Sequence, residues 1–241
     1  MYSKPEKIQI FAIIPCWFWV FVLVPMFMPF IGLGLWTQWE VSVWLEIAYH
    51  VVNGVAMFLL MLSYFKEEWF MFTTDLRYYL KHIALTVGMI LVTELLFLST
   101  MFFRNLNIID MLECLPVVEM FNSHTPLFVI QLQPIVGTIV LSVFPPISIC
   151  VLFYCLGFAP ICEKKPWLAY LCIALITLIP PIIDILWRGQ AAMTLSGYLV
   201  RLPVHLFACW SYQKTDNVLT PMLSLAITNL ILSIILQIFV L

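Results

Sequence analysis

The stretch PISICVLFYC, from Pro146 to Cys155, carries no charge and directly follows a second proline, Pro145. What such a run means depends on the solvent around it, and the composition of the chain identifies that solvent. Of the 241 residues, 63% are hydrophobic and only 10% are charged. A chain of this kind cannot present the charged surface of an ordinary soluble domain. The sequence therefore predicts an integral membrane protein.

The apolar residues fall into segments that are long enough to cross a bilayer. A helix needs about 20 residues to span about 30 Å of hydrocarbon, and it satisfies its own backbone hydrogen bonds there. We therefore expect an all-α fold, a polytopic integral membrane bundle of seven or eight transmembrane helices. The expected spans are 8–35, 41–65, 83–103, 127–161, 167–187, 191–212 and 216–241.

The fourth of these segments decides between seven and eight spans. It is long enough to cross twice, and Pro145 and Pro146 interrupt it. Each proline removes a backbone donor and crowds the preceding turn. A single crossing would place Lys164, Lys165 and Lys214 on the same side as the early lysines, so we favour one long, broken helix.

The loops predict the orientation in the membrane. Five cations precede the first span or lie between the second and third, at Lys4, Lys7, Lys66, Arg77 and Lys81. The loop from 104 to 126 is acidic and carries only Arg104. The excess of cations on cytoplasmic loops then puts the N-terminus in the cytoplasm and loop 104–126 outside. Between spans two and three, KEEWFMFTTDLRYYLKH (66–82) is typical of an amphipathic helix in the interface, or of a wet connector with belt aromatics.

Several classes of function are disfavoured by the rest of the sequence. The seven cysteines form no CxxC pair, which argues against a disulfide framework or a zinc knuckle. The cations form no basic run, so nucleic acid is excluded as a partner. The first apolar segment is too long for a signal-peptide core and lacks a cleavage site, so we expect it to remain as the first span.

Ionisable residues inside the expected spans suggest a role or a partner, because each is costly in hydrocarbon. Three pairs and one single residue stand out: Glu46 with His50, Asp184 with Arg188, Arg201 with His205, and Glu94 in the middle of its span. Each pair is four residues apart and shares a helix face. They could form polar contacts between helices, or Glu46, His50 and Glu94 could bind an ion. HExxH is absent, and we expect no metal and no cofactor.

From about residue 127 to the end, the chain resembles the CPBP family of CAAX-protease and bacteriocin-processing (Abi-type) intramembrane proteases. The resemblance divides the chain into N-terminal helices at 1–126 and a CPBP-like core at 127–241. PISICVLFYC resembles the family's first motif through Pro146, Ile147, Ser148 and Phe153. The last motif is matched by Thr215, Asn217, Leu219, Pro221 and Asn229.

The resemblance implies that the catalytic groups have been lost. The family's paired glutamates correspond to Ile149 and Cys150, its arginine to Tyr154, its second motif to Thr177 and Pro181, and its last histidine to Leu225, while Asn229 stays polar. Family members are thought to hold a metal or activate a water with two carboxylates and two histidines, which these residues cannot do. An apolar helix also disfavours the thiolate that a catalytic Cys150 would need. In a shifted register, APICE (159–163) would begin the first motif.

We therefore expect a non-enzymatic, pseudoprotease-like scaffold in the cell membrane that binds another membrane protein or an apolar peptide, with no catalytic residue. The resemblance implies a bacterial source and a role in bacteriocin immunity or processing, or in regulating a cell-envelope enzyme. The vacated site is expected to be collapsed or filled by an apolar segment, with partner contacts near Ser224 and Ala226. The alternative is an intramembrane protease or small transporter that uses Glu46, His50 and Glu94.

Overall fold

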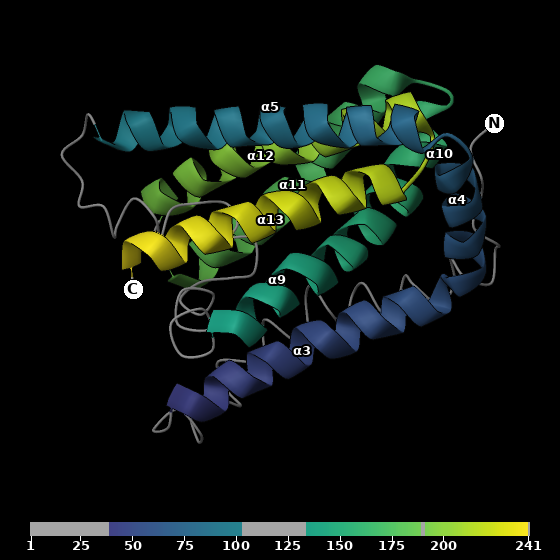
Figure 1. Cartoon of the computed structure of the whole chain (residues 1–241). Helices are drawn as coiled ribbons and strands as arrows, with labels where there is room; N and C mark the ends of the chain where they lie inside the picture. Colours follow the sequence, from purple (N-terminus) through teal and green to yellow (C-terminus); the bar gives the residue numbers. More distant parts are fainter. Residues whose placement is uncertain (1–38, 103–133, 189–190, 241) are drawn as a thin grey trace.

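The computed structural model describes residues 39–102, 134–188 and 191–240, and within these ranges every regular element is helical (Figure 1). The predicted all-α class is therefore confirmed for the described part of the chain. The helices are α3 (Trp39–Leu60), α4 (Leu62–Thr74), α5 (Leu76–Phe102), α9 (Pro134–Ile149), η2 (Cys150–Phe158), α10 (Ala159–Cys162), α11 (Pro166–Arg188), α12 (Ala191–Thr215) and α13 (Leu219–Val240). The expected first span, 8–35, and the loop 104–126 lie outside the described residues.

The long helices lie side by side, and α4 runs across one end of the bundle from α3 to α5 (Figure 1). Helix α3 packs on α9, and α9 packs on α13. Helix α13 also packs on α5 and α12, and α12 in turn packs on α5 and α11. The central position of α13 explains why its buried face continues along the helix from Thr220 to Ser233.

The fourth expected span is one continuous helix where the structure describes it. α9, η2 and α10 follow each other without a break, and residues Ile135–Cys162 form a single apolar stretch. The expectation of one long helix is thus confirmed over 134–162. Pro145 and Pro146 stay inside α9, and the helix widens to a π-helix at Cys150, where Ala159 N–H donates to Tyr154 O, five residues earlier. The prolines therefore do not end the helix, and a change of hydrogen-bonding pattern follows them.

Two helical stretches in the described ranges are long and apolar enough to cross a membrane, Leu76–Leu96 and Ile135–Cys162. The exposed faces of the other helices are also apolar. Large hydrophobic side chains face outward on several helices, including Val52 and Leu59 on α3, Val92 and Leu95 on α5, Ile135 and Ile139 on α9, Leu171 and Leu175 on α11, and Leu230 and Ile234 on α13.

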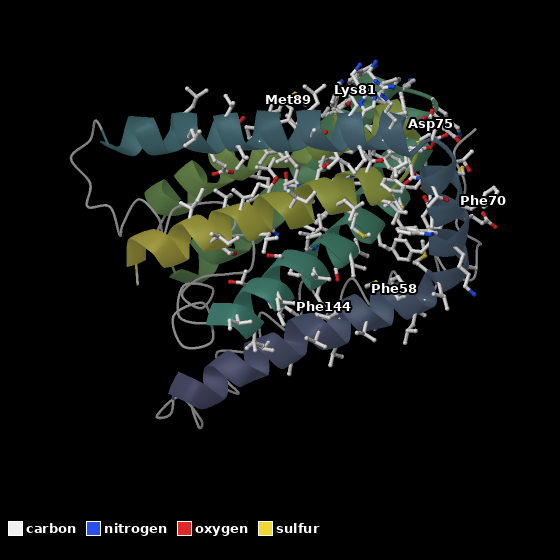
Figure 2. All side chains as sticks on the ribbon, viewed as in Figure 1. Phe58, Phe70, Asp75, Lys81, Met89 and Phe144 are labelled. Atoms are coloured by element: carbon white, nitrogen blue, oxygen red, sulfur yellow. The ribbon has the colours of Figure 1, made fainter. Side chains whose placement is uncertain are left out.

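Helix α3 lies close against α9 because Gly54 has no side chain. A Cβ atom at Gly54 would lie 2.5 Å from Cδ1 of Phe144, which is far inside van der Waals contact. Figure 2 shows Phe144 at the junction of these two helices. The small residue therefore sets the distance between the helices, as small residues commonly do in helix pairs within membranes.

The segment 66–82 does not form the single interfacial helix that its pattern suggested. Helix α4 ends at Thr74 and α5 begins at Leu76, because Asp75 leaves the helical region at φ −130° and ψ 57°. Its carboxylate accepts a hydrogen bond from Tyr78 N at 3.4 Å. The part of the segment that lies in α4 nevertheless has a buried face and an exposed face. On the exposed face the side chain of Phe70 is 74% exposed, and it points away from the bundle in Figure 2.

Candidate functional site

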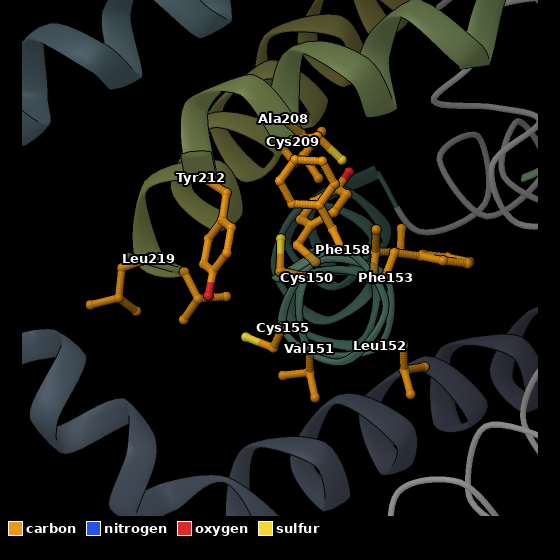
Figure 3. Close-up of a cluster of buried hydrophobic side chains, with 14 of the residues drawn as sticks. Cys150, Val151, Leu152, Phe153, Cys155, Phe158, Ala208, Cys209, Tyr212 and Leu219 are labelled. Atoms are coloured by element: carbon orange, nitrogen blue, oxygen red, sulfur yellow. The ribbon is translucent and has the colours of Figure 1, made fainter. Parts of the chain in front are cut away.

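The motif positions that the resemblance singles out lie in one buried apolar core. Ile149 and Cys150 meet at the junction of α9 and η2, Tyr154 follows one turn later, and Leu225 lies on α13. All four side chains are at most 4% exposed and belong to the same core. Figure 3 shows side chains packed around η2 on several sides, with Tyr212 from α12 beside it. Buried side chains therefore occupy these positions.

The remaining motif positions lie on α11 and α13. Thr177 is buried on α11, where its hydroxyl donates locally to Ile173 O at 2.9 Å. Asn229 is buried on α13. The side chain of Pro181 lies outside the described residues. Helix α11 packs on α12, α10 and η2, whereas α13 packs on α9, α5 and α12, so the second and last motifs are on helices with α12 between them.

The structure does not bring His50 and Glu94 together. His50 is buried on α3, which packs on α9, and Glu94 is buried on α5, which packs on α12 and α13. Helices α9 and α13 separate α3 from α5 in the bundle (Figure 1). His50 and Glu94 thus lie on helices that are not neighbours, and the expected ion-binding group of Glu46, His50 and Glu94 stays a prediction. Side chains of four predicted residues lie outside the described part of the chain: Glu46, Asp184, Arg188 and Arg201.

No group of three or more His, Cys, Asp or Glu side chains that could hold a metal ion occurs among the described residues. Glu94 is 1% exposed, and neither of its carboxylate oxygens has a hydrogen-bond partner within the described ranges. A buried carboxylate without a partner is costly. The described surroundings thus leave both oxygens of the Glu94 carboxylate without a hydrogen bond.

Tyr154 and His205, which the sequence analysis named for different reasons, are in contact. The hydroxyl of Tyr154, at the position of the family's arginine, lies 3.0 Å from Nδ1 of His205 on α12. Both side chains are buried, and the ring of Phe153 stands edge-on to His205 at a centroid distance of 5.7 Å. This polar contact joins the π-helix to α12.

The most extensive buried polar contact in the described structure involves Glu68, which the sequence analysis did not single out. Glu68 is fully buried on α4, and its carboxylate accepts a hydrogen bond from Val218 N at 2.8 Å. Its backbone carbonyl accepts another from Asn217 Nδ2 at 2.8 Å. Asn217 Oδ1 accepts from Leu219 N at 2.9 Å. Glu68 and Asn217 together cap the N-terminus of α13, where backbone N–H groups have no partner within the helix.

Neighbouring groups hold the same corner of the bundle. The Cys155 thiol donates to the hydroxyl of Tyr64 at 3.4 Å, which ties η2 to α4. The turn before α13 passes through Asp216, whose φ of 51° lies in the left-handed region. Burial raises the pKa of the Asp216 carboxyl above its usual value.

The spacing of apolar residues in α4 could have revealed Glu68 from the sequence, because Glu68 lies on the same buried stripe as Met61, Tyr64, Phe65 and Phe72.

The buried acid and the buried thiol of this core are engaged or enclosed. A general base must reach the proton that it removes, or hold a water in place. The carboxylate of Glu68 is fully buried and engaged with a backbone N–H, and Cys150 is fully buried among apolar side chains. Comparison with models of known protein families, with curated proteins and with solved structures finds no match to this chain.

Proposed function

We propose that this chain is a multi-pass, CPBP-like membrane scaffold without hydrolytic activity, which binds another membrane protein or an apolar peptide. The proposal has three parts: the chain crosses the bilayer seven or eight times, its vacated catalytic positions serve the packing of the bundle, and its outer apolar faces are the surface that a partner meets. A bacterial cell membrane and a role in bacteriocin immunity or cell-envelope regulation follow from the family resemblance alone.

Support for several crossings comes from the outer faces of the helices. α3, α11, α12 and α13 have 22, 23, 25 and 22 residues, enough at 1.5 Å per residue to cross about 30 Å of hydrocarbon. Large apolar side chains are exposed on α3, α5, α9, α11 and α13. A water-soluble monomer rarely exposes apolar surface on so many of its elements. Lipid is the solvent that suits such a surface.

Support for the orientation comes from the exposed cations. Six of them lie in or beside the connections at the end of the bundle that α4 covers: Lys66, Arg77, Lys81, Lys164, Lys165 and Lys214. We call this the basic end. Contacts between Tyr78 and Lys214 and between Glu68 and Val218 hold these connections together. Lysine and arginine mark cytoplasmic loops largely irrespective of nearby acids, so the basic end is the cytoplasmic end.

The single observation that carries the non-enzymatic part is the filled core at the motif positions. Ile149, Cys150, Tyr154 and Leu225 are all buried in one apolar core, in a protein that would otherwise need a polar, water-containing site there. Replacing charged residues by apolar ones removes the reason for water to enter, and close packing is the main gain that remains between helices in a bilayer.

The surface available to a partner differs in one detail from the expectation. Ser224 is fully buried, and its hydroxyl donates to Thr220 O, so it cannot contact a partner directly. Ala226 is partly exposed and lies beside Ile227 and Leu230 on the outer face of α13. Contacts made there would be apolar and nearly insensitive to salt.

Co-purification tests this proposal. The full-length, tagged protein is extracted in an uncharged detergent, and proteins retained in stoichiometric amount are identified. We expect a membrane protein or apolar peptide to be retained by the wild type and by Cys150→Ala, and to be lost with Ala226→Trp, which should keep the wild-type melting temperature because Ala226 is partly exposed. A peptide-cleaving activity that is lost with Cys150→Ala would contradict the proposal, as would retention by Ala226→Trp.

One observation favours a second candidate, a small transporter. Glu94 is a buried carboxylate in a candidate span and has no partner among the described residues. Buried acids in such positions often mark ion or proton pathways. Partner retention that survives Ala226→Trp but is lost with Glu94→Gln would favour this reading.

A further inference from the structure

A group of exposed cations at the basic end has no anionic partner in the described structure. Arg77 and Lys81 lie one turn apart on α5, so they share a face of the helix. Lys214 lies at the end of α12, and both Lys81 and Lys214 are close enough to His82 to act on it electrostatically. None of the three cations forms an ion pair within the described ranges. Figure 2 shows Lys81 among side-chain nitrogen atoms that gather at this end.

The backbone beneath these cations is held in place. The hydroxyl of Tyr78 donates to Lys214 O at 2.6 Å, which fixes the end of α12 against the first turn of α5. The ring of His82 stands edge-on to Tyr78 at a centroid distance of 4.6 Å and lies 5.9 Å from the ring of Trp210. These aromatic side chains form a floor that joins the two helices. The cations therefore stand on a fixed base and not on a flexible tail.

The acids at the same end do not pair with these cations in the described structure. Asp75 and Asp216 are close enough to Tyr79 to act on it electrostatically, and the Asp75 carboxylate accepts a hydrogen bond from Tyr78 N. Nδ1 of His82 is buried beneath the surface and has no hydrogen-bond partner among the described residues. Three exposed cations without an ion pair therefore stand together over this floor, a composition that suits an anion with several oxygen atoms.

We propose that Arg77, Lys81 and Lys214 bind the phosphate of an anionic phospholipid headgroup. This inference rests on the proposed membrane location, because the site then lies at the level of the headgroups of the cytoplasmic leaflet, which is rich in anionic lipid. Phe70 and Trp69 are exposed on the adjoining α4 and would lie in the same interfacial layer. A lipid is favoured over free phosphate because the candidate span that begins at Leu76 continues directly into the bilayer beside the site.

Native mass spectrometry of the full-length protein in uncharged detergent tests this site, with phosphatidylglycerol and phosphatidylcholine as the two probes. The wild type should retain phosphatidylglycerol preferentially. Each cation that contacts the headgroup contributes about a fivefold gain in affinity, so Lys81→Gln with Lys214→Gln should weaken this binding by about 25-fold. The matched control, Lys164→Gln with Lys165→Gln, removes two exposed charges at the same end and should change the affinity less than twofold.

Two further arms keep the result interpretable. Lys81→Arg with Lys214→Arg should retain the preference, which separates loss of charge from loss of fold. Added inorganic phosphate should not displace the lipid. Three results would each overturn the proposal. The wild type could retain the two lipids equally, the test and control pairs could lose equal affinity, or inorganic phosphate alone could displace the lipid. Partner retention, measured on the same samples, is independent of these outcomes, so a failure of the lipid site can be told from a failure of the scaffold.

Discussion

Replacing Glu68 tests how the buried corner of the bundle is held together. In the wild type, the N–H of Val218 lies 2.8 Å from the carboxylate of Glu68, in a site that water does not reach. In Glu68→Ala this N–H loses its acceptor. A hydrogen bond to a charged group contributes about 1.5–3 kcal/mol, and an unsatisfied buried donor costs about 1–3 kcal/mol. Both figures describe the loss of the same hydrogen bond, so they are not added. We take the upper end of the two ranges and expect the free energy of unfolding to fall by about 3 kcal/mol.

The measurement is thermal unfolding of the purified protein in detergent, followed by intrinsic fluorescence. For a chain of this size about 3 kcal/mol corresponds to a melting temperature lower by about 6–12 °C. Glu68→Gln keeps an acceptor without the charge and should lose about half as much. The adjacent Glu67 is exposed, so Glu67→Ala is the matched control and should change stability by less than about 0.5 kcal/mol. Equal effects of Glu67→Ala and Glu68→Ala would refute the capping role.

Two further predictions concern contacts between helices. Gly54→Ala should lower the free energy of unfolding by about 1–3 kcal/mol, because its Cβ would lie 2.5 Å from Phe144. Gly88→Ala, where a Cβ meets nothing within 4 Å, should stabilise the protein by about 0.5–1 kcal/mol, and thermal unfolding that ranks the two variants the other way would be inconsistent with the α3–α9 contact. Tyr154→Phe should cost about 1–3 kcal/mol because the ring nitrogen of His205 loses the hydroxyl 3.0 Å away; an unchanged melting temperature would show that this contact contributes nothing.

The sequence predicted the helical class well because in a membrane protein the length of an apolar segment carries most of the information. The single helix over 134–162 followed from the distribution of lysines, even though the proline pair suggested a break. Its π-helical section was not foreseen, since nothing in the residues of η2 distinguishes a π-helix from an α-helix. The division between α4 and α5 was also missed, because it depends on one residue, Asp75, whose backbone leaves the helical region.

Site prediction failed where it needed the neighbours of a helix. A spacing of four residues shows which residues share a face, but it does not show which helix that face meets. His50 and Glu94 were therefore grouped, although α9 and α13 separate their helices. Glu67 and Glu68 are chemically identical neighbours, and only the phase of the buried stripe on α4 tells that Glu68 is the buried one. Tyr154 and His205 meet because η2 packs near α12, a pairing that no local pattern encodes.

Access of a membrane-impermeant maleimide to one introduced cysteine in intact cells, measured against the background chain that keeps its other five cysteines, tests the proposed multi-pass arrangement most directly. The background is the chain with Cys16→Ala and Cys114→Ala, to which Asn107→Cys or Lys165→Cys is added. Because the helix over 134–162 would cross the bilayer once, the two positions should lie on opposite sides. We expect Asn107→Cys to be labelled in intact cells and Lys165→Cys to be labelled only after the membrane is opened. Labelling of both from the same side would contradict the single crossing and, with it, the multi-pass scaffold.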